Sequence, residues 1–240
     1  MNFERGSLSQ WIWLPANGPN WLFCLITLSV IAAFSGTVQA QPAPTVTNAM
    51  LKPQLSPNPV SESVWENRVG EGFRPTTQSI GLSAGAAYGI VTFGGREAHD
   101  LSLVSLSYGH MLSHTRGEGH WYRGNFEVRF ELFTGAQFSP STEWLVGLTP
   151  HLRYNFAAGT RWMPFVDGGA GVTATSIGSP DLSGTFEFNE QLGTGIHWFL
   201  KDNVALTLES RYIHWSCAGI SKPNLGLNGV TGMLGLTLFF

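Results

Sequence analysis

The sequence has only two cysteines among its 240 residues, Cys24 and Cys217. Cys24 lies within the one long apolar run, residues 21–36, which is too short for a membrane-spanning helix. Small residues follow at 38–40, in the pattern that a signal peptidase cleaves. We therefore predict a signal peptide at residues 1–40; the alternative is an uncleaved membrane anchor. Cleavage leaves Cys217 as a single thiol and excludes an internal disulfide.

The chain also lacks a strong net charge and any basic block. Its formal net charge is −3, so nothing in the sequence favours nucleic acid as a partner. Histidines 110, 114 and 120 are spaced irregularly around a predicted turn, so we predict no metal site, and no cofactor is indicated. Residues 41–77 are rich in proline, serine and asparagine and are predicted to form a loose N-terminal arm. One domain remains, at residues 78–240.

No segment after residue 78 keeps a helical period. Even-numbered positions are mostly apolar and odd-numbered positions are small or polar, which is the period of a β-strand. Residues 101–112 follow this alternation least clearly. The alternating segments are 78–91, 100–114, 120–137, 143–157, 160–175, 185–200, 203–217 and 227–240. Each is long enough to be a membrane-spanning strand, so we predict an all-β fold, an eight-stranded antiparallel transmembrane β-barrel.

Four further patterns favour a barrel in the bacterial outer membrane. The breaks between strands alternate between shorter and longer ones, and the chain ends on Phe240, like the C-terminal signal of such barrels. Aromatic residues lie near strand ends, as an interfacial girdle requires: Trp121, Tyr122, Trp144, Trp162 and Trp198. Charges of both signs occupy odd positions and are predicted to fill a narrow lumen, which makes transport an unfavoured function. The alternative is a soluble lipocalin-like barrel with its apolar residues turned inward.

A candidate catalytic pair lies at the end of the seventh predicted strand. His214 and Ser216 are two residues apart and therefore point to the same face of a strand, here the apolar, lipid-facing one. If the N-terminus lies in the periplasm, this strand ends at the outer rim. A general base beside a hydroxyl at the membrane surface suggests cleavage of a lipid ester. The alternative is a girdle histidine beside a solvated serine.

The sequence after this pair resembles a known family. Residues Ser216, Ala218, Gly219, Ile220, Pro223, Asn224 and Gly226, together with residues 164–172 and 186–195, are similar to the lipid A 3-O-deacylase (PagL-like) family of outer-membrane barrels. The resemblance implies a serine hydrolase that removes a 3-O-linked hydroxyacyl chain from lipid A. Lipopolysaccharide of the outer leaflet is then the substrate and partner, and a homodimer is consistent with the family.

The resemblance also implies roles for individual residues. Ser216 would be the nucleophile and His214 its base, while Ala218, Gly219 and Asn224 would supply or shape the oxyanion site. The family has a glutamate where this chain has Asn228, and an asparagine where it has Cys217. An asparagine can hold an imidazole but cannot neutralise its charge.

Glu190 is a charge on an otherwise apolar strand face. If Leu200 faces Val204 across the short turn before the seventh predicted strand, counting back along both strands places Glu190 opposite His214, and we predict that it serves as the acid. The alternative is that this carboxylate reaches the lipid headgroups. The alternative function for the whole chain is a non-catalytic structural barrel, which the loss of the family glutamate favours.

Overall fold

The computed structural model describes residues 73–92, 94–157 and 161–240, and these form eight β-strands. The predicted signal peptide and all of the predicted arm before residue 73 lie outside the described residues. The strands are β1 (Gln78–Gly89), β2 (Asp100–Met111), β3 (Gly124–Ser139), β4 (Glu143–Phe156), β5 (Trp162–Thr175), β6 (Phe186–Lys201), β7 (Val204–Ser216) and β8 (Leu227–Phe239).

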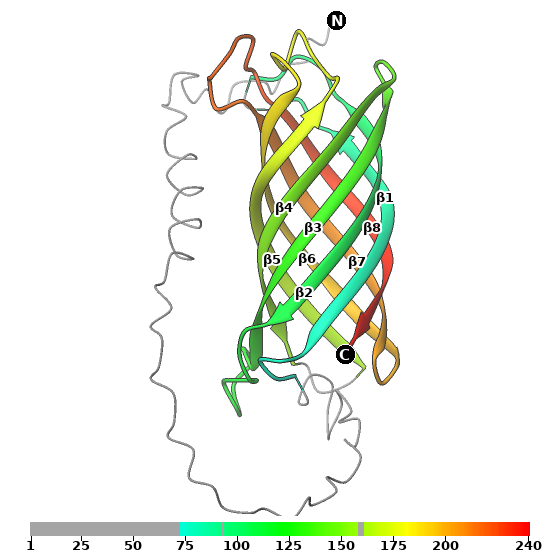
Figure 1. Ribbon diagram of the computed structural model, residues 1–240, viewed down its shortest axis with the longest axis vertical. Helices are drawn as coiled ribbons and strands as arrows, with labels where there is room; N and C mark the ends of the chain where they lie inside the picture. The colour runs from blue at the N-terminus through cyan, green and yellow to red at the C-terminus, as the bar shows by residue number, and fades with distance from the viewer. Residues whose placement is uncertain (1–72, 93, 158–160) are drawn as a thin grey trace, which may run out of the picture.

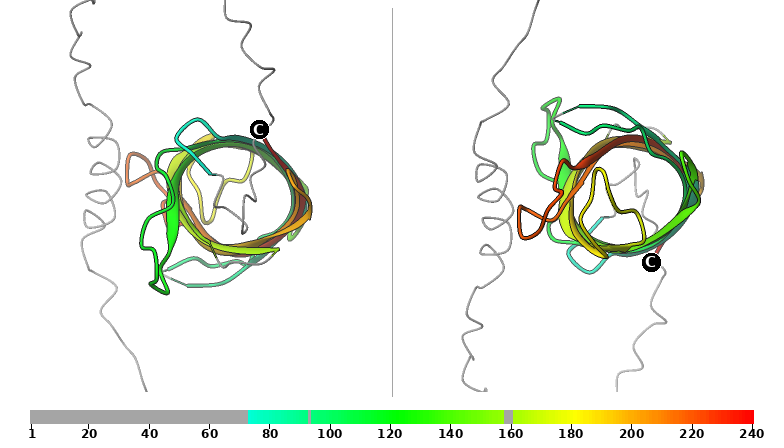
Figure 2. Two further views of the ribbon diagram at one scale, coloured as in Figure 1. Left: turned by 90° about the horizontal axis from the view of Figure 1, so that it is seen from below. Right: turned by 90° about the horizontal axis from the view of Figure 1, so that it is seen from above.

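Each strand pairs with the next in antiparallel orientation, and β8 pairs with β1, so the sheet is a closed barrel (Figures 1 and 2). This confirms the predicted eight-stranded antiparallel barrel. The strand bounds agree with the sequence pattern except between β2 and β3. Their connection runs from residue 112 to residue 123 rather than over the predicted short break, because it folds into a turn closed by the bridge between Arg116 and Gly124. No described residues form a helix long and apolar enough to cross a membrane.

Apolar side chains cover the outer wall of the barrel. Leu82, Leu192 and Leu208 are 60%, 70% and 56% exposed, whereas the lumen charges Glu131, Arg153 and Arg211 are buried. This arrangement is the reverse of a soluble barrel and is that of a wall facing lipid. Trp162 stacks on Trp198 across β5 and β6 with ring centroids 5.1 Å apart, and both rings are partly exposed at one barrel end, as the predicted girdle requires.

Paired charges fill the middle of the lumen. Arg153 donates to Asp167 over 2.6 Å and to Glu209 over 2.7 Å, and Arg211 bonds Glu131 and Glu209. An eight-stranded barrel is just wide enough to be filled in this way. The lumen is therefore a packed interior, in line with the prediction that charge plugs it.

Apolar clusters close the lumen at both ends. At one end Phe73, just before β1, is 1% exposed and stacks on Phe239 with ring centroids 5.2 Å apart. At the other end, Ile177 and Leu182 of the β5–β6 connection pack with Leu101, Leu103 and other lumen residues. Viewed from above in Figure 2, this connection lies across the barrel mouth.

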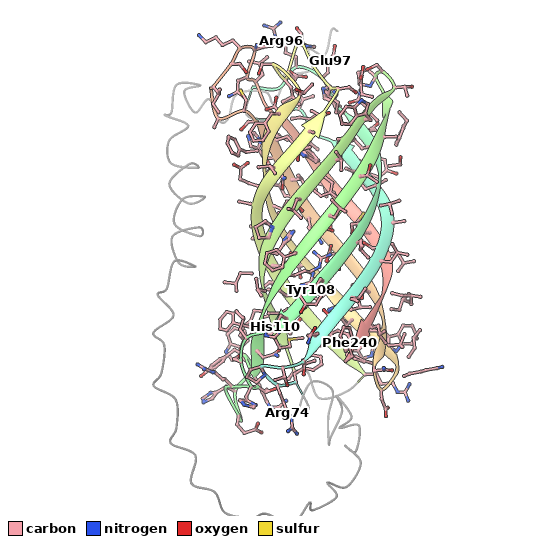
Figure 3. The ribbon with its side chains drawn as sticks, viewed as in Figure 1. Arg74, Arg96, Glu97, Tyr108, His110 and Phe240 are labelled. Atoms are coloured by element: carbon pink, nitrogen blue, oxygen red, sulfur yellow. The ribbon has the colours of Figure 1, made fainter. Side chains whose placement is uncertain are left out.

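The two rims differ in what they carry. The upper end in Figure 1, here called the outer rim, carries the connections β1–β2, β3–β4, β5–β6 and β7–β8, while the C-terminus lies at the lower end. Figure 3 places Arg96 and Glu97 of the β1–β2 connection at the outer rim and His110 and Phe240 at the opposite end. Because β7 runs toward the outer rim, His214 and Ser216 lie near that rim.

Candidate active site

Three polar residues form a row across the outer wall near the outer rim. Glu190 on β6 is paired directly with His214 on β7, and His214 is paired directly with Asn228 on β8. All three occupy even positions, the face that carries the lipid-exposed leucines. Directly opposed side chains on one face lie about 5 Å apart at Cβ. The register therefore brings the imidazole between a carboxylate and an amide.

The strand register places Glu190 opposite His214 as predicted, while its role as the acid stays a prediction, and the turn below it differs from the expectation. Leu200 was expected to face Val204, but Lys201 pairs with Val204 and the register shifts between Phe199 and Lys201. The shift is local to the turn, so the rest of the ladder keeps the predicted register.

His214 forms its hydrogen bond with Asn228 rather than with Glu190. The distance from its Nδ1 to the Asn228 Oδ1 is 2.8 Å, and the Tyr212 hydroxyl donates to the same oxygen over 2.5 Å. Glu190 is half-buried, and its Oε2 atom has no hydrogen-bond partner among the described residues. The carboxylate thus lies beside the imidazole without being bonded to it.

The orientation of the Asn228 amide follows from a third contact. Its Nδ2 donates to the main-chain carbonyl of Thr92 over 3.0 Å, and Asn228 is only 3% exposed beneath this part of the β1–β2 connection. A carbonyl can only accept, so the amide nitrogen must face Thr92 and the amide oxygen must face the ring. The His214 Nδ1 must then carry the proton, which leaves a lone pair on Nε2. This is the tautomer of a general base.

Ser216 lies one row above His214 on the same face of β7, opposite Phe188. Its side chain is partly exposed and forms no hydrogen bond with the described residues, so the hydroxyl is open to a substrate. Gly226 passes close to the imidazole edge: a Cβ atom there would lie 2.6 Å from His214 Cε1 and 3.4 Å from Nε2. Gly226 also has a φ of 80°, so both the narrow space beside the imidazole and the backbone conformation favour glycine at this position.

The predicted oxyanion donors lie in the turn that follows Ser216. The Cys217 N–H donates to Asn224 Oδ1 over 3.0 Å, so this amide is not available to an oxyanion. With its oxygen engaged, Asn224 directs its amide nitrogen away from Cys217. Ala218 and Gly219 are exposed and have positive φ angles of 53° and 82°, which turns the chain sharply beside Ser216.

Cys217 is buried and belongs to the packing of this turn. Burial raises the pKa of its thiol, but hydrogen bonds with Ser183, Ser221 and Gly219 outweigh this effect and set the pKa below its ordinary value. The thiol contacts the Ser183 hydroxyl at 3.5 Å, so it ties the β7–β8 connection to the β5–β6 connection.

The sequence pattern missed three participants. The Tyr212 hydroxyl was visible in principle, because Tyr212 shares a face with His214 two residues away. The Thr92 carbonyl carries no side-chain signature, and its contact with Asn228 spans 136 residues. The third is Asp181 of the β5–β6 connection, which bonds both the β1–β2 and the β7–β8 connections and is described below.

Comparison with known proteins identifies the family. The family model described as lipid A 3-O-deacylase (PagL) matches residues 82–237. A lipid A deacylase PagL of Bordetella bronchiseptica is 28% identical over 167 residues, which cover 62% of this chain and 86% of that protein. The lipid A deacylase PagL of Pseudomonas aeruginosa is 32% identical over 85 residues, 34% of this chain and 46% of that protein, so this match spans less than half of its length.

A solved structure supports the same fold. The crystal structure of the outer membrane enzyme PagL superposes with a TM-score of 0.50 at 20% identity, covering 65% of this chain and 97% of that one. The homodimer expected from the resemblance stays a prediction. The barrel, its lipid-facing wall and the family match over residues 82–237 agree: the chain belongs to the lipid A 3-O-deacylase (PagL) family of bacterial outer-membrane proteins.

Proposed function

We propose that the protein hydrolyses the ester that joins a 3-O-linked hydroxyacyl chain to the glucosamine backbone of lipid A. The observation that carries the proposal is the row Glu190, His214 and Asn228, with Ser216 directly above it on the lipid-facing wall. The substrate is then the lipopolysaccharide of the outer leaflet, whose ester bonds lie at the depth of the outer rim. The relatives named lipid A deacylase support this choice of substrate.

In the first half of the reaction, Nε2 of His214 takes the proton of the Ser216 hydroxyl as its oxygen attacks the ester carbonyl. The main-chain N–H groups of Ala218 and Gly219 and the amide nitrogen of Asn224 are the candidate donors to the oxyanion. Collapse of the tetrahedral intermediate breaks the ester bond, and the imidazolium of His214 protonates the departing sugar alkoxide. Water then attacks the acyl-serine by the same route and releases the hydroxy fatty acid.

Two residues share the work of the family glutamate in this proposal. Asn228 holds His214 in the tautomer that leaves Nε2 free, because the Thr92 carbonyl fixes the amide orientation. In a serine protease triad an asparagine at the acid position lowers turnover about 10⁴-fold, chiefly because it selects the wrong tautomer. Here the contact with Thr92 fixes the amide so that Asn228 selects the tautomer with the proton on Nδ1. Glu190, paired across from His214, supplies the negative charge that stabilises the imidazolium.

The experiment is deacylation of lipopolysaccharide by the full-length protein purified from outer membranes in detergent, followed by mass spectrometry of lipid A. The expected result is the loss of one hydroxyacyl mass and the appearance of the free hydroxy fatty acid. Ser216→Ala should abolish both. Ser210→Ala is the matched control, because Ser210 lies on the same face of β7, lower on the wall, and should keep full activity.

A wild-type protein that leaves lipid A intact would overturn the proposal. It would support the second candidate, a structural barrel of the same family. The observation that favours this second candidate is the absence of the family glutamate at Asn228.

A further inference from the structure

A buried carboxylate in the β5–β6 connection holds two other connections in place. Asp181 is fully buried, and its side chain accepts the N–H of Arg96 over 2.7 Å and the N–H of Glu97 over 3.0 Å. Its Oδ2 also bonds His99 Nε2 at 3.0 Å. These three partners belong to the segment between β1 and β2, so the carboxylate fixes that segment from a distance of more than eighty positions in the chain.

The main chain of the same residue holds the segment between β7 and β8. The Asp181 carbonyl accepts the N–H of Leu225 over 3.0 Å and that of Gly226 over 3.3 Å. The two held segments also meet, because a Cβ atom on Gly95 would lie 3.0 Å from the Gly226 carbonyl oxygen. Asp181 thus joins three connections at the outer rim.

A further contact anchors this junction to the barrel wall. The second ring nitrogen of His99, Nδ1, lies 2.7 Å from Gln137 Oε1, near the end of β3. The Gln137 amide nitrogen donates to the Ser141 carbonyl over 3.1 Å, so its oxygen must face the histidine. Asp181 is therefore connected through His99 to a rigid strand.

Both held segments contact the His214 site. The β1–β2 connection supplies the Thr92 carbonyl that orients Asn228, and the β7–β8 connection supplies Gly226, which lies against the His214 ring. We propose that Asp181 is a positioning residue for ester hydrolysis, which holds Thr92 against Asn228 and Gly226 against His214. This inference rests on the proposed function, and it assigns Asp181 no contact with the substrate.

The charge state of Asp181 agrees with this role. Burial raises the pKa of its carboxyl, but the N–H groups of Arg96 and Glu97 and the ring of His99 outweigh burial and hold the pKa below its ordinary value. The carboxylate therefore remains ionised at neutral pH, and hydrogen bonds to a charged acceptor are stronger than those to a neutral one.

Limited trypsin digestion tests the junction without reference to activity. Arg96 is exposed, but the N–H groups on both sides of its peptide bond with Glu97 are held by Asp181. A protease requires that bond in an extended, mobile segment. Asp181→Ala should raise the rate of cleavage after Arg96 at least about tenfold, while cleavage after Lys201 at the opposite rim stays constant as an internal reference.

Kinetics then separate a positioning role from a merely structural one. Asp181→Ala should lower kcat about tenfold or more and leave KM within about threefold, because a shift of about 1 Å at a catalytic group can lower the rate 10²-fold. In an Asn228→Ala background the same change should lower kcat less, because the contact between Thr92 and Asn228 that Asp181 is proposed to maintain is already absent. Asp202→Asn, an exposed carboxylate in the β6–β7 turn, is the control that should match wild type.

Each outcome decides the inference. Unchanged cleavage after Arg96, or faster cleavage with unchanged kcat, overturns it. If Asp181→Ala does not reach the membrane as a folded barrel, judged by heat-modifiable migration, Asp181→Asn gives the same comparison, because its amide keeps only one acceptor for the three donors. A wild-type protein without deacylase activity overturns the proposed function instead, and the digestion result still reports whether the junction exists.

Discussion

Replacing Glu190 by glutamine removes one charge and keeps the shape of the side chain. Glu190 lies directly opposite His214, at a Cβ separation of about 5 Å. Two unit charges about 5 Å apart interact by about 0.8 kcal/mol at the dielectric constant of water and about 3.3 kcal/mol at an effective value of about 20. These limits correspond to about 4-fold and about 250-fold in rate. Because Glu190 is half-buried, we expect a loss of about tenfold.

The loss should appear in kcat, because the imidazolium exists only after Ser216 has lost its proton. KM should not change, since Glu190 is proposed to act on His214 rather than on lipid A. The assay measures initial rates of hydroxy fatty acid release by mass spectrometry at several surface concentrations of lipopolysaccharide. Glu143→Gln is the control: Glu143 is a carboxylate at the same rim, bonded to the Ser176 hydroxyl at 2.6 Å. A Glu190→Gln rate within twofold of wild type would refute the assigned role. It would support the alternative, in which the Glu190 carboxylate reaches the lipid headgroups.

Three other predictions follow from the geometry. Gly226→Ala should lower kcat at least about tenfold with the barrel intact, because the new Cβ would lie 2.6 Å from His214 Cε1. The backbone conformation at this position would add about 1–3 kcal/mol of strain for alanine. Gly178→Ala is the control and should not change kcat in the same assay, because no atom lies within 4 Å of its new Cβ. Arg153→Met should lower the free energy of unfolding by about 3–5 kcal/mol, measured by urea unfolding in detergent, because it removes the nearest arginine partner of Asp167 and one of the two arginine partners of Glu209 in the lumen. Since the pKa of Asp181 is lowered on folding, its stabilising contribution is present above about pH 4 and is lost as the pH falls further, so exchange protection of the amides that it binds should fall between about pH 4 and pH 2; constant protection over that range would contradict this.

The strands could be predicted because each face of the wall has one kind of environment. Lipid selects apolar residues at even positions, and a narrow lumen filled by ion pairs selects polar residues at odd ones. The pattern weakened in β2 because Leu101 and Leu103 face the lumen and are buried there, beneath the β5–β6 connection. At this end of β2 the lumen-facing positions are apolar and the outward-facing Ser102 is polar, which reverses the alternation of the other strands, so alternation alone could not assign the two faces.

The row around His214 could be predicted in part, because a short turn fixes the register of two strands. Counting from the turn placed Glu190 opposite His214 even though a local shift displaces the turn itself. Asn228 was located by its family alignment, and the structure adds that it occupies the neighbouring place in the same row. Side chains on regular strands therefore follow from sequence period and register.

The parts that could not be predicted lie in the connections between strands. The Thr92 carbonyl is a main-chain atom, which every residue type supplies equally. Asp181 follows Ser179 and Pro180 in a segment that reads as an ordinary turn, and its partners lie more than eighty positions earlier in the chain. Loop contacts over such separations have no period, so they become visible only when the folded chain brings the segments together.

In the proposed reaction, the position of the row Glu190, His214 and Asn228 on the outside of the wall has a kinetic consequence. A lipid arrives by lateral diffusion within its own leaflet and never has to leave it, so the encounter is two-dimensional and its rate depends on the number of molecules per unit area. The height of the row above the bilayer centre would also select which ester bond reacts. An ester at that depth can reach the Ser216 hydroxyl, whereas a chemically similar ester deeper in the leaflet cannot.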